Sequence, residues 1–312
     1  MVSACDPTAS TSLPYLEACT SPTVGSNLYR EASQQYPGEP IFAEAFRTGQ
    51  PYSDMEMRRR ALYTLKDEVR RWSSFQDMLV NDNQVVRITL TFIHPDLVEI
   101  ILLNHSLAQP SNINRDQFAN ELKIQLGKLA DYNELFFLVT VTDSSYKPLI
   151  TEKDVVVLSI PARDITLMNS KKEYVAPSHY DPPLGQNIQI SRKHLSGYVA
   201  FPMFVKDKND QCVLMLEPPS NTTITVGATN IKLSTTSGNV SNHQLTWFIR
   251  YHSLLDINIV PTPAIVSDQN IAPECCHAPP TPDIAKLPTD EEYWNSYWVE
   301  IARYVWGYVV AP

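Results

Sequence analysis

Short segments in which every second side chain is apolar follow one another from residue 134 to residue 251. Val199, Phe201, Met203 and Val205 are one example, and a charged turn at 206–210 separates them from the next segment. Alternation of this kind is typical of antiparallel strands in a β-sandwich. It predicts a hairpin between 197–205 and 211–217. The eight predicted strands are 134–142, 154–160, 164–168, 187–191, 197–205, 211–217, 222–233 and 244–251.

Helical spacing precedes these strands, so the predicted fold class is α+β. Ser53 and Glu56 form a capping box, and apolar residues at steps of three and four predict a helix over 54–79. A strand over 86–92, with one buried and one wet face, follows it. Pro95 suits the first turn of a second helix, and Asn114 caps a third that carries Phe118, Leu122, Leu126 and Leu129. We expect these N-terminal amphipathic helices to cover the sandwich.

The chain has 24 prolines and only 9 glycines, and many of the prolines lie in its two flanks. Residues 1–50 show no sustained periodicity and are predicted to be an extended tether. The helix-covered β-sandwich domain spans 51–252, a proline-rich spacer spans 253–288, and an aromatic docking helix spans 289–312. The few glycines also argue against a Gly-rich phosphate-binding loop.

The last segment begins with a capping box at Thr289 and Glu292, and it is rich in tyrosine and tryptophan. Its charged residues argue against a membrane-spanning helix. The sequence leaves three possible positions for this helix: packed on its own sandwich, bound to a protein partner or second copy, or seated at a membrane interface. The residues predicted to contact a partner are Trp294, Tyr297, Trp298, Ile301, Tyr304, Val305 and Tyr308.

The five cysteines are an odd number. With Cys5 set aside as a lipid acceptor, Cys19, Cys212, Cys275 and Cys276 allow three pairings, and the sequence alone does not choose between them. We expect Cys275 or Cys276 to tie the proline-rich segment to Cys212 or Cys19 in an oxidising compartment. Reduced thiols are the alternative. The adjacent cysteines lack the spacing of a zinc site, so no metal is predicted.

The start of the chain, Val2-Ser3-Ala4-Cys5, resembles the lipobox of bacterial lipoproteins. The resemblance implies acylation of Cys5 if Met1 stands inside a longer precursor, and Asp6 resembles the signal for retention at the inner membrane. The strand pattern over about 134–251 looks like the immunoglobulin-like modules of bacterial surface lipoproteins. Together these imply an exported protein, lipid-anchored on the periplasmic or extracellular side of a bacterial membrane.

No catalytic motif appears, and the seven histidines are scattered. His179-Tyr180-Asp181 is interpreted as a proline-flanked turn. A net charge of −9 argues against a nucleic-acid partner, and no cofactor is predicted. The sequence therefore predicts a non-catalytic structural or assembly subunit of a larger envelope complex. The alternatives are a glycan-binding surface module, with Trp247 and Tyr251 or the C-terminal aromatics as stacking platforms, and a hydrolase whose residues meet only in the fold.

Overall fold

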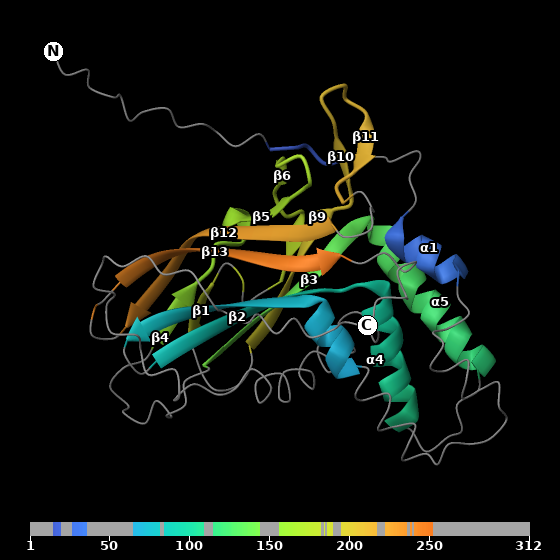
Figure 1. The fold of residues 1–312 in the computed structure, drawn as a ribbon, viewed down its shortest axis with the longest axis horizontal. Helices are drawn as coiled ribbons and strands as arrows, with labels where there is room; N and C mark the ends of the chain where they lie inside the picture. The colour runs from blue at the N-terminus through green and yellow to red at the C-terminus, as the bar shows by residue number, and fades with distance from the viewer. Residues whose placement is uncertain are drawn as a thin grey trace, which may run out of the picture.

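The computed structural model describes residues 15–19, 27–35, 65–81, 84–108, 115–143, 156–181, 184, 186–189, 195–216, 222–235, 238 and 240–251. They form two antiparallel sheets, a two-stranded ribbon and helices gathered at one end of the sheets (Figure 1). The predicted α+β class, with mainly antiparallel β-structure, is confirmed.

The first sheet has five strands in the order β1-β2-β3-β9-β7. The second sheet has the order β6-β5-β12-β4-β8, and β13 pairs with β12. Since β12 is long, β5 and β4 pair with successive parts of one edge while β13 pairs with the other. The first-sheet bounds are β1 (Ser73–Asn81), β2 (Gln84–Phe92), β3 (Glu134–Asp143), β9 (Leu195–Pro202) and β7 (His179–Tyr180). Those of the second sheet are β6 (Tyr174–Val175), β5 (Ile165–Met168), β12 (Thr222–Thr235), β4 (Val156–Ser159), β8 (Asn187–Gln189) and β13 (Val240–Tyr251), with a 3-10 turn, η1 (Ala162–Asp164), between β4 and β5.

The predicted hairpin is present as the ribbon of β10 (Phe204–Lys206) and β11 (Cys212–Leu214). Val205 pairs with Val213 across it, and the ribbon projects from the sheets (Figure 1). The strands β6 and β7 were not predicted, because segments of two residues carry no measurable alternation.

The prediction that β2 has one wet face is wrong. Arg87, Thr89 and Thr91 are buried, with exposed fractions of 5%, 0% and 0%. Their polar groups find partners inside the protein: Arg87 forms two hydrogen bonds of 2.7 Å to Asp77, and the Thr91 hydroxyl lies 2.6 Å from that of Ser73. Polar residues at alternate positions therefore do not mark a solvent-facing strand here.

The two sheets are joined by side chains that bond to backbone across the interface. The buried Trp247 of β13 donates its indole N–H to the Ile88 carbonyl at 3.0 Å. Gln76 of β1 donates to the Thr246 carbonyl at 2.8 Å. The position of β13 beside β1 is visible in Figure 1. Trp247 thus belongs to the interior, which rules it out as a glycan-stacking platform.

Two helices fall where the sequence predicts them, α4 (Pro95–Ala108) and α5 (Arg115–Tyr132). The predicted helix over 54–79 is wrong in its last part: residues 65–71 are helical, but 73–79 belong to β1. The spacing of Phe75 and Leu79 fits either structure. Pairing along the whole of β2 decides in favour of the strand, because it satisfies the backbone hydrogen bonds of both segments.

Part of the predicted tether over 1–50 belongs to the folded domain. It contains α1 (Leu28–Gln35), whose Tyr29 is fully buried and donates its hydroxyl to the Ile93 carbonyl at 2.8 Å. Asn27 accepts hydrogen bonds from the backbone N–H groups of Tyr29 and Arg30, as a helix N-cap does. Its amide also donates to the Ala130 carbonyl at 2.8 Å, so the start of α1 is bonded to the end of α5.

Residues 15–19 are also bonded to the fold. Leu16 donates its backbone N–H to Tyr174, and Cys19 donates to Phe204. A disulfide joins Cys19 to Cys212 across a sequence separation of 193. Because these two cysteines bond to each other, the expected bond from Cys275 or Cys276 to either of them is wrong.

The predicted spacer over 253–288 and the aromatic helix over 289–312 lie outside the described residues. Of the helices that the structure describes, none has both the length and the apolar character to cross a membrane.

Replacing both Cys19 and Cys212 by serine should destabilise the protein by about 5 kcal/mol, the loop-closure entropy of a separation near 200 residues. Urea unfolding of the wild type, the double variant and the reduced wild type measures this. The reduced wild type should match the double variant. An unchanged midpoint in both would show that the bond does not restrict the unfolded chain.

Candidate functional site

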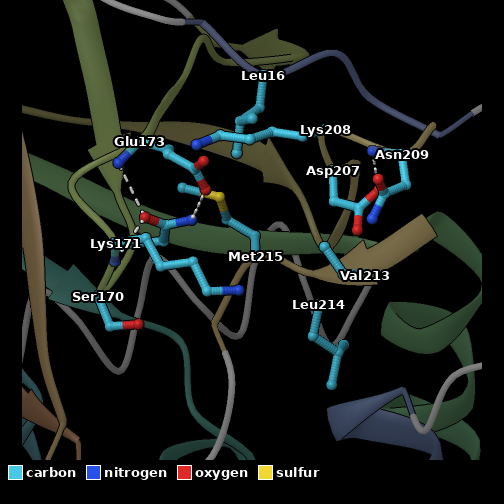
Figure 2. A pocket seen from close by; sticks show the side chains of 11 residues that line it. Leu16, Ser170, Lys171, Glu173, Asp207, Lys208, Asn209, Val213, Leu214 and Met215 are labelled. Atoms are coloured by element: carbon cyan, nitrogen blue, oxygen red, sulfur yellow. Dashed lines mark hydrogen bonds between the residues drawn. The ribbon is translucent and has the colours of Figure 1, made fainter. Parts of the chain in front are cut away.

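A hollow of about 350 Å³ lies where the two turns 169–173 and 207–211 face each other (Figure 2). The first turn joins β5 to β6 and the second joins β10 to β11. Leu16, from the N-terminal segment, lines it as well. The hollow is therefore built from three parts of the chain that are distant in sequence. Val213, Leu214 and Met215 contribute apolar surface, and Ser170, Lys171, Glu173, Lys208 and Asn209 contribute polar groups.

The two turns have the same construction. The Asn169 side-chain oxygen accepts the backbone N–H groups of Lys171 and Glu173, and Asp207 accepts those of Asn209 and Gln211 in the same way. The fourth residue of each turn, Lys172 or Asp210, has a positive φ near 60°. Asn and Asp suit such turns because their side chains replace missing backbone acceptors. These bonds fix the shape of the hollow.

Charge around the hollow is mixed. The backbone N–H groups of Gln211 and Asn209 lower the pKa of Asp207, with a smaller contribution from Lys171. Asn169 donates its amide to the Glu173 carboxylate at 2.9 Å. With both ammonium and carboxylate groups beside an apolar wall, the hollow could hold a small amphipathic group, but no group in it is arranged as a nucleophile with a base.

A second surface lies at the β7 edge of the first sheet. His179 Nδ1 lies 2.5 Å from a carboxylate oxygen of Glu134, which is only 8% exposed, while His179 is 67% exposed. Burial and the nearby charges of Asp181, Glu134 and Tyr132 raise the pKa of Tyr198. We call this surface the acidic–aromatic face; it consists of Tyr132, Glu134, Phe136, His179, Asp181 and Tyr198.

The turn interpretation of His179-Tyr180-Asp181 is therefore incomplete. His179 and Tyr180 form a strand that pairs with β9, and Asp181 donates its backbone N–H to Tyr198. Glu134 and Tyr198 were not predicted as site residues. One sequence signal could have identified Glu134: it is a carboxylate directly before a run of apolar residues, 135–139, and a carboxylate beside a buried segment needs a hydrogen-bonding partner.

A third polar cluster lies in the interior. His94 stacks on the Trp72 ring with centroids 3.9 Å apart, and its Nδ1 lies 3.3 Å from Asp96. Glu68 accepts a hydrogen bond from the Trp72 indole at 2.9 Å. Because His94 is 1% exposed, this cluster fixes the helix of residues 65–71 against the start of α4 and offers no access to a substrate.

The outer side of the second sheet carries a row of larger side chains. Backbone pairing places Met168 opposite both Tyr174 and Thr225, and Thr225 opposite Phe248. Phe248 is 59% exposed, whereas its neighbours in sequence, Trp247 and Ile249, are buried. We call this the outer row: Tyr174, Met168, Thr225 and Phe248.

The structure joins only two of the predicted site residues, Cys19 and Cys212. The lipidation residue Cys5, the cysteines Cys275 and Cys276, and the predicted docking residues from Trp294 to Tyr308 lie outside the described residues. Within the part of the chain that is described, no three His, Cys, Asp or Glu side chains gather as metal ligands.

Comparison with known proteins finds no matching family model, no matching curated protein and no matching solved structure.

The interior cluster predicts two opposite pH dependences. Burial raises the pKa of Glu68 above its usual 4.5, so ionised Glu68 disfavours folding at higher pH. Burial also opposes ionisation of Asp96 and is the largest single effect on its pKa. The His94 charge, the hydrogen bond with His94 and the Arg71 charge together outweigh burial and lower this pKa below 3.8, so ionised Asp96 favours folding. The Glu68→Gln variant should therefore gain stability relative to wild type as pH rises above about 4.5. The Asp96→Asn variant should lose stability at neutral pH, and its deficit should shrink below about pH 3.8.

Urea midpoints of the wild type and both variants at about pH 3, 5.5 and 8 measure these trends. Each variant serves as the control for the other, since the two carboxylates share one cluster. Stability differences that do not change with pH, or that change in the same direction, would contradict the assignment.

Proposed function

We propose that this protein is a non-catalytic, exported structural or assembly subunit of a bacterial envelope complex, held at the membrane by a lipid on Cys5. Its scaffold in this proposal is an immunoglobulin-like sandwich that presents surfaces to other proteins. The aromatic segment from Trp294 to Tyr308 is proposed as an additional contact.

The observation that carries the proposal is the outer row. A sheet face open to water normally carries polar side chains, but Met168, Tyr174 and the largely exposed Phe248 line up across three strands. Their neighbours in the next row are small: Gly227 pairs with Thr166 on one side and with Thr246 on the other. Phe248 therefore protrudes from the sheet beside small residues, and a cluster of exposed apolar side chains of this kind marks protein contacts.

The disulfide supports the exported compartment. Cys212 is exposed, so its bond to Cys19 is accessible to cytosolic reductants and persists most readily where thiols are oxidised. This bond is consistent with the periplasmic or extracellular location in the proposal.

A photo-crosslinking amino acid placed at Phe248 should yield a covalent adduct with a partner protein when the chain is expressed in its own bacterium. The matched control is the same amino acid at Leu79, which is 56% exposed but lies on the first sheet. Adducts detected by mass shift on a denaturing gel should form at Phe248 and be absent or several times weaker at Leu79. Equal yields at both positions, or none at Phe248, would contradict the proposed contact surface.

The anchor is tested separately by mass spectrometry of the N-terminal peptide of membrane-extracted protein. Acylation predicts a peptide that starts at Cys5 and carries the added mass of lipid, and Cys5→Ala should release the protein from membranes. A native peptide that starts at Met1 and has no added mass would rule the anchor out while leaving the crosslinking result unaffected.

A further inference from the structure

We propose that residues 15–19 form a redox-controlled strap: a dithiol reductant that cleaves the Cys19–Cys212 disulfide releases this segment from β6 and β10 and opens the hollow between the two turns. The proposal uses neither the outer row nor the lipid on Cys5. It therefore stands or falls independently of the proposed function.

The first half of the strap is bonded to the edge of the second sheet. Tyr15 forms a parallel bridge with Tyr174 of β6, and Leu16 donates its backbone N–H to the Tyr174 carbonyl at 2.7 Å. In the strand order of that sheet, β6 stands at the end. Leu16 also lines the hollow, so the strap supplies part of the hollow's wall (Figure 2).

The second half of the strap is bonded to the ribbon. Cys19 donates its backbone N–H to the Phe204 carbonyl at 3.1 Å, and Lys206 donates its own N–H to the Glu17 carbonyl at 2.8 Å. The Cys19 side chain is bonded to Cys212 of β11. The strap thus connects the ribbon to the second sheet.

This connection joins the two turns that face each other across the hollow. The strap is bonded directly after the first turn, at Tyr174, and directly before the second, at Lys206. Asn169 and Asp207 form their hydrogen bonds within their own turns. Release of the strap would therefore leave each turn intact, remove a connection between them and take Leu16 out of the hollow.

The strap buries little surface of its own. Tyr15 is 53% exposed, Glu17 and Ala18 are exposed, and Leu16 is only partly buried. The ion pair between Glu17 and Lys206 spans 3.6 Å at the surface, where such pairs contribute little. A segment with few buried contacts and few backbone bonds opens readily. The disulfide is therefore the main attachment of the strap.

The disulfide can be attacked from solvent. Cys212 is exposed, whereas Cys19 is half-buried. A thiolate of the dithiol reductant attacks the Cys212 sulfur and forms a mixed disulfide, and Cys19 leaves as a thiolate that takes up a proton. The second thiol of the reductant then displaces Cys212. Two electrons and two protons pass from the dithiol to the two cysteines, and the reductant ends as a disulfide.

Amide hydrogen exchange of the full chain, before and after reduction with dithiothreitol, tests the release. We expect exchange at Leu16, Cys19 and Lys206 to accelerate about tenfold or more, because their N–H groups bond the strap to β6 and β10. The N–H groups of Val98 and Met203 bond elsewhere in the domain, so their exchange should change by less than about twofold.

Two variants separate the bond from the contacts around it. Cys19→Ser/Cys212→Ser should show the accelerated exchange without any reductant, which excludes an effect of dithiothreitol on other cysteines. The matched control is Glu17→Gln, which removes the ion pair to Lys206 and keeps the disulfide. Its exchange at the strap amides should stay within about threefold of the oxidised wild type.

The rate of disulfide reduction, measured at urea concentrations below the unfolding transition, tests access to the bond. Reduction of the folded protein should proceed at a rate that does not depend on urea, because the exposed sulfur needs no unfolding to react.

Three results would overturn the proposal. One is unchanged exchange at Leu16 and Cys19 after complete reduction, because the contacts would then hold the strap without the bond. Another is equal acceleration at Val98 and Met203, because reduction would then unfold the whole domain. The third is a reduction rate that increases with urea in parallel with global unfolding.

Discussion

The central strands of the first sheet have no face in contact with water, and the rest of the described structure follows from this constraint. In β3 every residue from Glu134 to Thr142 is buried, and β2 is buried from Val85 to Phe92. A sheet covered on both sides has to satisfy each polar side chain internally, because no water is available to do so. Three side-chain pairs provide these internal partners. Arg87 pairs with Asp77 and Ser73 with Thr91 between β1 and β2, and the Thr140 and Ser196 hydroxyl oxygens lie 2.9 Å apart between β3 and β9. One buried face is thus fastened by polar pairs, while aromatic rings such as Phe92 and Phe137, with centroids 5.0 Å apart, occupy the other.

The N-terminal segment, although it has little periodicity, belongs to the fold because Asn27 supplies hydrogen bonds where α5 meets β3. The end of α5 and the start of β3 meet at Asn133, whose positive φ reverses the chain. Asn27 donates to the Asn133 side chain at 3.0 Å, and Met203 donates its backbone N–H to the Asn133 carbonyl. Three segments that are distant in sequence therefore close on one corner of the central sheet. The acidic–aromatic face begins next to this corner, at Tyr132 and Glu134, which is why the positions of its side chains depend on the whole sheet and not on a local turn.

Sequence patterns predict most of the strands and two of the helices because those elements carry a clear period. The long strands β3, β12 and β13 are each found within a few residues of their expected bounds, and the helices α4 and α5 begin where the sequence predicts. The patterns mispredict secondary structure and burial where contacts between distant segments determine them. The spacing of residues 73–79 fits a helix equally well, and only their pairing with β2 shows that they form a strand. Arg87 has the pattern of a solvent-facing residue, and only its ion pair with Asp77 explains its burial.

For the candidate site, the sequence analysis singles out His179 to Asp181 but not Glu134 or Tyr198, since only the strand order β3-β9-β7 brings them together. The Cys19–Cys212 bond is hidden for the same reason: four cysteines allow three pairings, and spacing does not distinguish them.

Among the residues that the structure describes, four that are not glycine have a positive φ, where glycine would be the usual residue: Asn133, Lys172, Asp210 and Asn230. This backbone region costs an ordinary residue about 1–2 kcal/mol, which glycine would avoid. At three of these positions the side chain also forms bonds that glycine cannot replace. One of them is Asp210, whose carboxylate pairs with the Lys206 ammonium at 3.0 Å. Asn133 accepts from Asn27, and Asn230 donates to Asp164 at 3.1 Å, linking the bulge in β12 to η1. Lys172 and Asp210 lie in the matched turns whose shape is set by Asn169 and Asp207, and there the side-chain acceptor offsets the backbone cost. The chain thus uses polar residues at these turns, where they reverse the backbone and their side chains form hydrogen bonds or ion pairs that hold the turn in place.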